Sequence, residues 1–241
     1  MPWNLDGRVG VVLGVSSAIG KELTARLVNV HQMRLACVSR SDVSSSVPSG
    51  CAVLKADLTA SSECDAVMKK IKELVGPVSL LVNCAGVTLN KVHVRCTDEE
   101  YDALMDVNVR GALQVTRSAL RYGGMLQEMD GCVVHIGSLV GLMGNGGQVI
   151  YSASKAALSG AVKSWAREYG SKNIRFNVIA PALIEGEGMA ETISDRQVEE
   201  WQRRCPLGRL ATVEDVVDAI IGTVRCRYIN GQTINVDGGM Y

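Results

Sequence analysis

Residues 8–20 read RVGVVLGVSSAIG, and this stretch decides the fold. Its first half is a short apolar run, which is typical of a strand that is buried on both faces. Gly14 and Gly20 then frame a turn of small residues, and a helical pattern begins near Lys21. A strand that passes through such a turn into a helix is the opening unit of an α/β domain.

The alternation of strand and helix continues to the end of the chain. Residues 61–75 and 212–224 have helical patterns, and short runs rich in valine, isoleucine and leucine separate such segments. These runs are RVGVVLG, RLACVS, AVLKAD, VSLLVN, CVVHIG, IRFNVIA and QTINVD. The pattern predicts one α/β domain over residues 1–241, a Rossmann-type doubly wound parallel sheet of seven strands with helices on both faces.

Composition excludes several classes of function. The chain has 241 residues, of which 47% are hydrophobic, and this is enough to fill one large core. Lysine plus arginine and aspartate plus glutamate each number 25, so the formal net charge is zero. Without a basic surplus to attract phosphate backbones or anionic lipids, nucleic-acid binding is not expected as the main role.

Two uncharged segments resemble membrane or export signals. Residues 9–20 mimic the apolar core of a signal peptide, but Asp6 and the glycines favour a buried strand. Residues 131–154 are long enough to cross a bilayer, yet their middle is rich in glycine and includes Asn145 and Gln148. We expect no membrane association and a soluble intracellular protein of the cytoplasm or the mitochondrial matrix.

Cysteine and histidine give no pattern of a metal site. The eight cysteines form no C-x-x-C pair, so free thiols in a reducing compartment are expected. The three histidines are far apart in sequence and make no H-x-x-x-H motif. His135 lies in the strand run VVHIG and is expected to be a hydrogen-bonded core residue, and no metal site is predicted.

The turn after the first strand is suited to a dinucleotide. Backbone N–H groups and the positive end of the following helix can face a pyrophosphate where the residues are small. The second strand ends in Ser39 and Arg40, where an NAD site would carry an acidic residue. Because a guanidinium can bind a 2′-phosphate through two N–H groups, Arg40 favours NADPH (NADP⁺), the alternative being an ordinary solvated arginine.

Three polar side chains are expected to converge downstream. Ser138 follows a predicted strand, and Tyr151 and Lys155 are four residues apart, on one face of a helix. An ammonium about 4 Å from a phenol favours the phenolate by roughly 4 kcal/mol at an effective dielectric constant near 20, or about three pKa units. Tyr151 is therefore the candidate proton donor to a carbonyl oxygen.

With these motifs in order, nearly the whole chain resembles the short-chain dehydrogenase/reductase family. Gly14 and Gly20 match its nucleotide loop, and Asn83-Cys84-Ala85-Gly86 resembles its N-N-A-G element. The resemblance implies a catalytic set in which Ser138 steadies the carbonyl, Tyr151 passes the proton, Lys155 binds the nicotinamide ribose and Asn108 holds a water relay. It also implies that Asp57 contacts the adenine. The full set of implied cofactor contacts is Gly14, Ser16, Ser17, Ile19, Gly20, Ser39, Arg40, Asp57, Leu58, Asn83, Ala85, Gly86, Tyr151, Lys155, Pro181 and Ile184.

Within this family, the segments IGSLVGLMGNGGQ, PLGRLATVEDV and VDGGMY most resemble 3-oxoacyl-[acyl-carrier-protein] reductases of type II fatty acid synthesis. The resemblance implies reduction of a 3-oxoacyl thioester, on acyl carrier protein or coenzyme A, in a homotetramer or a mixed tetramer with a related reductase. Alternatives are a carbonyl or quinone reductase or a hydroxysteroid dehydrogenase. A different class of alternative is a weakly active structural or regulatory subunit of a mixed tetramer.

The chain departs from the family pattern at several positions. Leu13, Val15 and Ala18 replace smaller or more flexible residues of the nucleotide loop, and their added methyl groups are expected to crowd the cofactor. Residues 185–206 form the expected substrate lid, in which Met189 and Trp201 either line an acyl channel or pack as the apolar side of a lid helix. For docking of an acidic carrier protein near the catalytic mouth, Lys172 is basic but Met129 is not. Other basic residues that either compensate or are simply solvated are Arg121, Lys163, Arg167 and Arg175.

Overall fold

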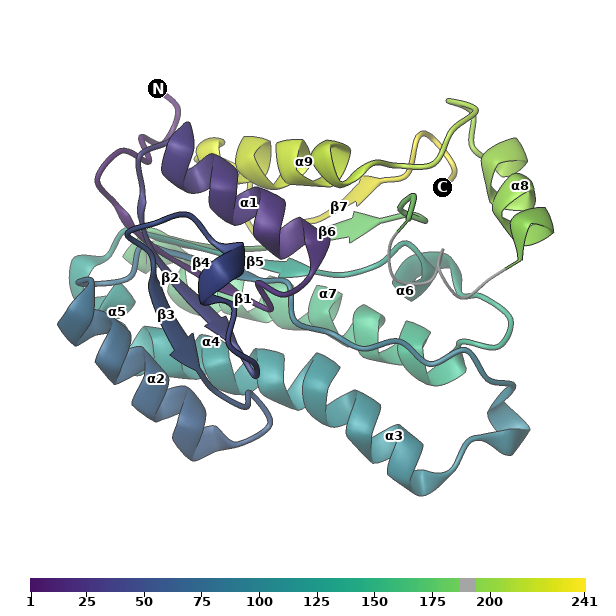
Figure 1. Ribbon diagram of the computed structural model, residues 1–241, viewed down its shortest axis with the longest axis horizontal. Helices are drawn as coiled ribbons and strands as arrows, with labels where there is room; N and C mark the ends of the chain where they lie inside the picture. The colour runs from purple at the N-terminus through teal and green to yellow at the C-terminus, as the bar shows by residue number, and fades with distance from the viewer. Residues whose placement is uncertain (187–193) are drawn as a thin grey trace.

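The computed structural model describes residues 1–186 and 194–241. Within these residues, seven parallel strands form one sheet in the order β3-β2-β1-β4-β5-β6-β7 (Figure 1). The strands are β1 (Val9–Leu13), β2 (Arg34–Ser39), β3 (Ala52–Lys55), β4 (Leu80–Asn83), β5 (Gly131–Ile136), β6 (Ile174–Pro181) and β7 (Thr233–Val236). The predicted α/β doubly wound parallel sheet is confirmed.

Helices cover both faces of the sheet, as expected for strands that are apolar on both sides. One face packs against α1 (Ala18–Asn29) and α9 (Val213–Arg225), which lie side by side above the sheet in Figure 1. The other face packs against α2 (Ser61–Leu74), α4 (Ala112–Arg121) and α7 (Val149–Tyr169). The central strands are buried on both sides by this arrangement, and every residue of β1, β4, β5 and β6 is buried.

Shorter elements connect these layers and several begin with a side-chain cap. Thr97 and Glu100 form a reciprocal capping box at the start of α3, and Thr212 and Asp215 do the same for α9. The remaining elements are η1 (Ser44–Ser46), η2 (His93–Arg95), α3 (Asp98–Met105), η3 (Asp106–Gly111), α5 (Met125–Glu128), α6 (Val140–Met143), η4 (Gly170–Lys172) and α8 (Asp195–Arg204).

The strand order reverses direction between β1 and β4, which are hydrogen-bonded neighbours. In open α/β sheets, ligands bind beyond the carboxyl ends of the strands at such a switch point. The loops that follow β1, β4, β5 and β6 leave the sheet at this same edge. The fold therefore brings Gly14, Ala85, Ser138 and Ile184 to one side of the domain.

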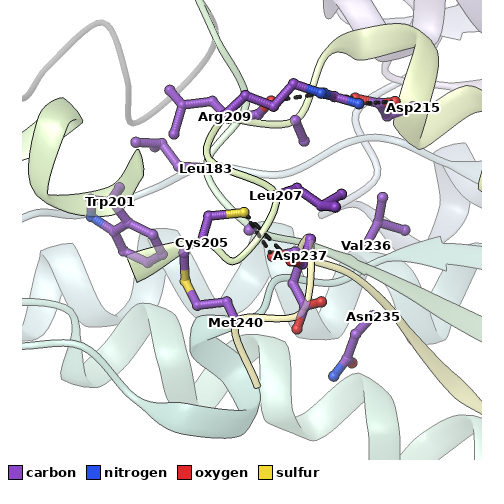
Figure 2. A pocket seen from close by; sticks show the side chains of 14 residues that line it. Leu183, Trp201, Cys205, Leu207, Arg209, Asp215, Asn235, Val236, Asp237 and Met240 are labelled. Carbon is purple, nitrogen blue, oxygen red and sulfur yellow. Dashed lines mark hydrogen bonds and ion pairs between the residues drawn. The ribbon is translucent and has the colours of Figure 1, made fainter. Parts of the chain in front are cut away.

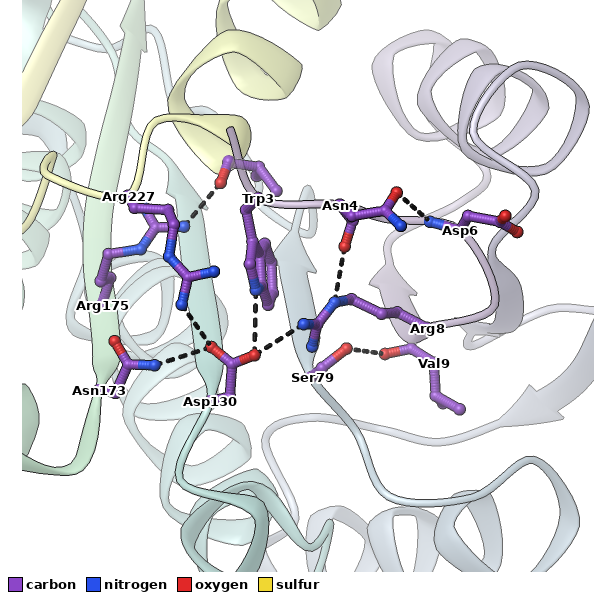
Figure 3. A network of polar contacts seen from close by, with 11 residues as sticks. Trp3, Asn4, Asp6, Arg8, Val9, Ser79, Asp130, Asn173, Arg175 and Arg227 are labelled. Carbon is purple, nitrogen blue, oxygen red and sulfur yellow. Dashed lines mark hydrogen bonds and ion pairs between the residues drawn. The ribbon is translucent and has the colours of Figure 1, made fainter. Parts of the chain in front are cut away.

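The opposite, amino-terminal edge of the sheet is tied together by Asp130, just before β5 (Figure 3). Its carboxylate accepts hydrogen bonds from Trp3 Nε1 at 3.2 Å, Arg8 at 2.7 Å and Asn173 Nδ2 at 2.9 Å. Arg227 lies 3.7 Å away on the same carboxylate. One half-buried carboxylate thus links the segments before β1, β5 and β6.

We expect Asp130→Ala to lower the free energy of unfolding by about 1–3 kcal/mol, because it leaves several donors without their acceptor. Urea unfolding followed by circular dichroism would measure the change. Asp6→Ala is the matched control, since Asp6 is an exposed carboxylate in the same amino-terminal segment. Equal stability of the two variants would contradict the role given to Asp130.

The positions considered for carrier-protein docking lie at this amino-terminal edge. Met129 precedes β5 and Lys172 precedes β6, whereas the catalytic residues follow the carboxyl ends of the strands. Arg175 is buried, and its guanidinium donates to the carbonyl oxygens of Thr223, Val224, Cys226 and Ile229 at 2.6–3.2 Å. Within this chain these positions thus lie at the edge of the sheet opposite the catalytic residues, and Arg175 holds the end of α9.

His135 is the core residue that the sequence predicts. It lies fully buried in β5, with its ring nitrogens 3.2 Å from Thr116 Oγ1 and 3.4 Å from Asn83 Nδ2. Its ring also stacks on Trp165 at a centroid distance of 5.6 Å. Burial, with a smaller contribution from the charge of Lys155, lowers the pKa of His135 to about 3.

A neutral buried histidine makes stability depend on pH. Below its ordinary pKa of 6.5 the unfolded chain takes up a proton at His135 that the folded chain does not. The contribution of neutral His135 to the free energy of unfolding is therefore fully present above pH 6.5. It is lost as pH falls from 6.5 toward 3, at about 1.4 kcal/mol per pH unit. We expect His135→Asn to flatten the decrease in unfolding free energy between pH 6.5 and 5, measured in urea. The exposed His93→Asn is the control, and an unchanged slope in His135→Asn would contradict the argument.

In the described part of the chain, no helix combines the length and apolar character that crossing a bilayer requires. The same residues contain no group of three or more metal-ligating side chains of histidine, cysteine, aspartate or glutamate. All eight cysteines are free thiols, as the sequence predicts.

Candidate active site

The nucleotide turn is held by Ser17, the N-cap of α1. Its hydroxyl donates to Gly14 O at 2.9 Å and accepts from Gly20 N at 3.1 Å. The first turn of α1 thereby keeps its orientation toward the carboxyl edge of the sheet. Two recesses lie at this edge of the sheet. Ser16, Ser17 and Ile19 line them, and Gly20 is buried beneath these residues.

Close backbone approach explains the two glycines of the turn. Gly14 has a φ of +71°, and a Cβ atom there would lie 2.5 Å from Ala85 N. A Cβ on Gly20 would lie 2.7 Å from Gly14 O. Both contacts are shorter than any side chain tolerates, so the turn is closely packed against the end of β4.

The expected crowding by Leu13 and Val15 is wrong. Both side chains are fully buried, with Leu13 in the core on the α2 and α4 face and Val15 in the core on the α1 and α9 face. Ala18 is the first residue of α1. Among the described residues that line the two recesses, none of the three appears. The added bulk of Leu13 and Val15 fills the core and leaves the cofactor side of the turn open.

One recess lies beyond β2 and β3 and contains the residues expected to recognise the adenosine half of a dinucleotide. Its cavity volume is about 120 Å³. Predicted contacts that line it are Gly14, Ser16, Ser17, Ser39, Arg40, Asp57, Leu58, Ala85 and Gly86. Arg40 is exposed at its edge, and Asp57 Oδ1 accepts from Thr59 N at 2.9 Å and from the Thr59 hydroxyl at 2.8 Å. These two bonds to Thr59, and to a lesser degree the charge of Arg40, lower the pKa of Asp57.

A second recess, with a cavity volume of about 230 Å³, contains the catalytic candidates Ser138, Tyr151 and Lys155. Predicted cofactor contacts that also line it are Ser17, Ile19, Gly86, Pro181 and Ile184. The two recesses share Ser17, Cys84, Gly86 and Val87, so they form one continuous groove across the switch point. The glycines in its lining, Gly14, Gly86 and Gly137, suit the close approach of a dinucleotide lying across the carboxyl edge of the sheet.

The electrostatics of Tyr151 differ from the sequence-based expectation. Burial raises the pKa of Tyr151, and a hydrogen bond with Ser138 opposes the increase only in part. Lys155 Nζ donates to Ile136 O at 2.9 Å and lies 5.7 Å from the centroid of the Tyr151 ring. Burial lowers the pKa of Lys155 itself to about 8. The predicted decrease in the tyrosine pKa is therefore wrong for the chain alone, because the ammonium is held by a backbone carbonyl and desolvation dominates.

Asn108 lies behind the groove. It belongs to the π-helical turn η3, which joins α3 to α4, and only 2% of its surface is exposed. Its side chain accepts from Val87 N at 2.8 Å, donates to Val87 O at 2.8 Å and donates to Ser154 Oγ at 3.1 Å. A π-turn of this kind is frequent at functional sites. Here the side chain of Asn108 fixes the backbone of Val87, which lines both recesses.

Two further predicted contacts lie outside the lining. Gly20 and Asn83 support the groove from beneath, since Asn83 Oδ1 accepts from Ala85 N at 3.1 Å.

Sequence reasoning missed Gln148, which is 2% exposed, lines the catalytic recess and donates to Asn90 Oδ1 at 2.6 Å. The signal for Gln148 was its place in the segment GNGGQ, three residues before Tyr151. Lining residues that were not predicted include Thr88 and Leu139, whereas Trp201 is one of the two residues considered for an acyl channel.

The expected lid over residues 185–206 is described in part. Residues 187–193, including Met189, lie outside the described residues. The following helix α8 begins at the Ser194–Gln197 capping box, and its Trp201 is 8% exposed. Trp201 packs with Leu139 and Leu183 and lines the catalytic recess.

Comparison with known proteins agrees with this geometry. The model of the family described as Enoyl-(Acyl carrier protein) reductase, a short-chain dehydrogenase/reductase model, matches residues 11–241. The chain belongs to the short-chain dehydrogenase/reductase family. The predicted resemblance is thus confirmed, and a member of this family is expected to be an oxidoreductase that uses a nicotinamide cofactor.

Individual members of the family are similar to this chain over nearly their full length. The 3-oxoacyl-[acyl-carrier-protein] reductase FabG of Thermotoga maritima is 33% identical over 98% of each chain, and that of Escherichia coli is 33% identical over 99% of each. Carbonyl reductase family member 4 of Xenopus laevis is 34% identical over 97% of this chain and 98% of its own. All three relatives are named as reductases, and their names differ in the substrate.

Proposed function

We propose that this short-chain dehydrogenase/reductase reduces 3-oxoacyl thioesters with NADPH, with Tyr151 as the proton donor. The observation that carries the proposal is the groove in which Ser138, Tyr151 and Lys155 stand at one end and Arg40 at the other. The similarity to 3-oxoacyl-[acyl-carrier-protein] reductases over the whole chain supports a thioester as substrate.

The residues around the groove suit reduction of a carbonyl. When bound, the cofactor supplies the hydride. The Ser138 hydroxyl holds the carbonyl oxygen, and Tyr151 donates its proton to that oxygen as it gains charge. Because burial raises the pKa of Tyr151, the phenol is protonated at neutral pH, which is the form that reduction requires. In this mechanism Lys155, whose pKa of about 8 lies near neutrality, binds the ribose and returns a proton to the phenolate.

The direct test is to incubate the purified protein with an acetoacetyl thioester and NADPH and to follow the loss of NADPH absorbance. An o-quinone and a small ketone are assayed in parallel. Turnover of the thioester with the highest kcat/KM supports the proposal, and turnover of the quinone alone would contradict it. A carbonyl or quinone reductase is the second candidate function, favoured by the similarity to carbonyl reductase family member 4.

The proposal includes a carrier or coenzyme A thioester as the substrate, a homotetramer or mixed tetramer as the assembly, and the cytoplasm or mitochondrial matrix as the location. The outer faces of α4 and α7 support an assembly, because Leu113, Trp165 and Tyr169 line a shallow depression there beside Arg117 and Arg121. Light scattering of the purified protein would measure the oligomeric state.

A weakly active structural subunit is less well supported, since Leu13 and Val15 fill the core and do not crowd the groove.

A further inference from the structure

A second cavity lies against the back wall of the catalytic recess. Its volume is about 270 Å³, and it shares Ala182, Leu183 and Trp201 with the recess that contains Tyr151. Figure 2 shows this cavity between α8, the loop before α9 and the segment that follows β7. A bulky group seated at Tyr151 would therefore reach it by passing the side chain of Trp201.

The walls of this cavity are suited to hydrocarbon. Leu183, Trp201 and Leu210 are buried apolar residues, and Met240 packs beside them. On the far side, Leu207 lines the cavity at the turn between α8 and α9. Because buried apolar surface favours an apolar ligand, these residues would bind an alkyl chain better than a charged group.

The lining also includes the polar side chain of Asn235, and the other polar groups at the rim are bound within the chain. Arg209 donates to Asp215 Oδ1 at 3.0 Å and to Leu210 O at 2.9 Å. Asp237 accepts from the backbone N–H groups of Gly239 and Tyr241 at 3.0 and 3.1 Å. The Cys205 thiol is directed to the carbonyl oxygens of Asp237 and Gly238 at 3.6 and 3.7 Å (Figure 2). These contacts hold the rim in place while the apolar walls remain for a ligand.

Trp201 is fixed where the two cavities meet. It belongs to the buried apolar cluster that contains Leu139 and Val140, and the guanidinium of Arg204 lies over its ring at 5.5 Å from the ring centroid. The capping box at Ser194 orders the start of the same helix. Trp201 is thus a defined partition between the reacting end of the groove and the second cavity.

We propose that the second cavity receives the alkyl tail of long 3-oxoacyl substrates, and that Trp201 sets the length at which the tail enters it. This inference rests on the proposed function. A four-carbon substrate occupies the catalytic recess alone, whereas a twelve-carbon tail extends past Trp201 toward Leu210 and Met240. Each methylene that leaves water contributes to transition-state binding, so kcat/KM increases with chain length.

The test compares kcat/KM for 3-oxododecanoyl and 3-oxobutanoyl N-acetylcysteamine thioesters, expressed as a ratio. Ala211 lines the second cavity and is absent from the described lining of the catalytic recess. Ala211→Phe, which fills the cavity, is expected to lower the ratio about tenfold or more, whereas Ala211→Ser changes it less than about twofold. Met240→Phe enlarges a side chain that lines the cavity and packs against the same apolar cluster, and it is expected to lower the ratio in the same way.

The outcomes separate the inference from the proposed function. If the wild-type protein reduces the four-carbon thioester and neither bulky variant lowers the ratio, the tail does not enter this cavity and the inference is overturned. If the wild-type protein reduces an o-quinone but no thioester of either length, the proposed function fails and the inference fails with it. A lower ratio in both bulky variants, with Ala211→Ser near wild type, supports the inference.

Discussion

Tyr151→Phe is expected to lower kcat for carbonyl reduction by about 10²–10⁴-fold, because it removes the proton that the carbonyl oxygen needs as hydride arrives. The ring remains in place, so the packing of Tyr151 against Leu139 and Val140 is preserved. In this variant Ser138 still holds the carbonyl oxygen. The phenol that donates the proton, and that Lys155 would re-protonate, is absent. Single-turnover absorbance measurements with saturating NADPH would report the chemical step directly.

The matched control is Tyr169→Phe, which removes a hydroxyl from the other end of the same helix. Tyr169 packs against Phe176 with ring centroids 5.8 Å apart, far along α7 from the groove. We expect its kcat to stay within about twofold of wild type, as for a substitution remote from the site. A Tyr151→Phe variant that folds normally by circular dichroism and retains its rate would refute the assigned role.

Much of the fold was predictable because its strands are buried on both faces. Runs such as VGVVL and GCVVHI are short, rich in valine and separated by helical segments, so they are assigned as strands that follow one another along the chain. The convergence of Ser138, Tyr151 and Lys155 was also predictable, since helix periodicity and the carboxyl ends of parallel strands place them together.

The parts that sequence reasoning missed depend on contacts between distant segments. The pKa of Tyr151 was predicted from one charge pair, but Lys155 is held by the carbonyl of Ile136, and burial decides the direction. The roles of Leu13 and Val15 depend on which way each side chain points, which a motif comparison does not show. Gln148 was missed because its hydrogen bond reaches Asn90, 58 residues away.

The second large effect concerns the choice of cofactor. Arg40→Asp is expected to lower the ratio of kcat/KM for NADPH to that for NADH by about 10²–10⁴-fold, through loss of two charge-assisted hydrogen bonds and added repulsion of the 2′-phosphate. Arg40 is exposed at the rim of the adenosine-side recess, directly after β2. Asp57 in the same recess is a carboxylate that accepts hydrogen bonds from Thr59, and it has no donor to offer a phosphate, so it cannot replace Arg40.

Arg34→Asp is the matched control, because Arg34 begins the same strand at the opposite edge of the sheet. It makes the same change in net charge, and so it separates local recognition from the long-range field of the protein. We expect Arg34→Asp to leave the cofactor ratio within about threefold of wild type, since a charge roughly 20 Å away along the strand, or about two Debye lengths, is largely screened. Titration of NADPH and NADH by fluorescence would measure binding apart from turnover. If Arg40→Asp and Arg34→Asp shift the ratio equally, then Arg40 is an ordinary solvated arginine, and recognition of NADPH must come from another part of the groove.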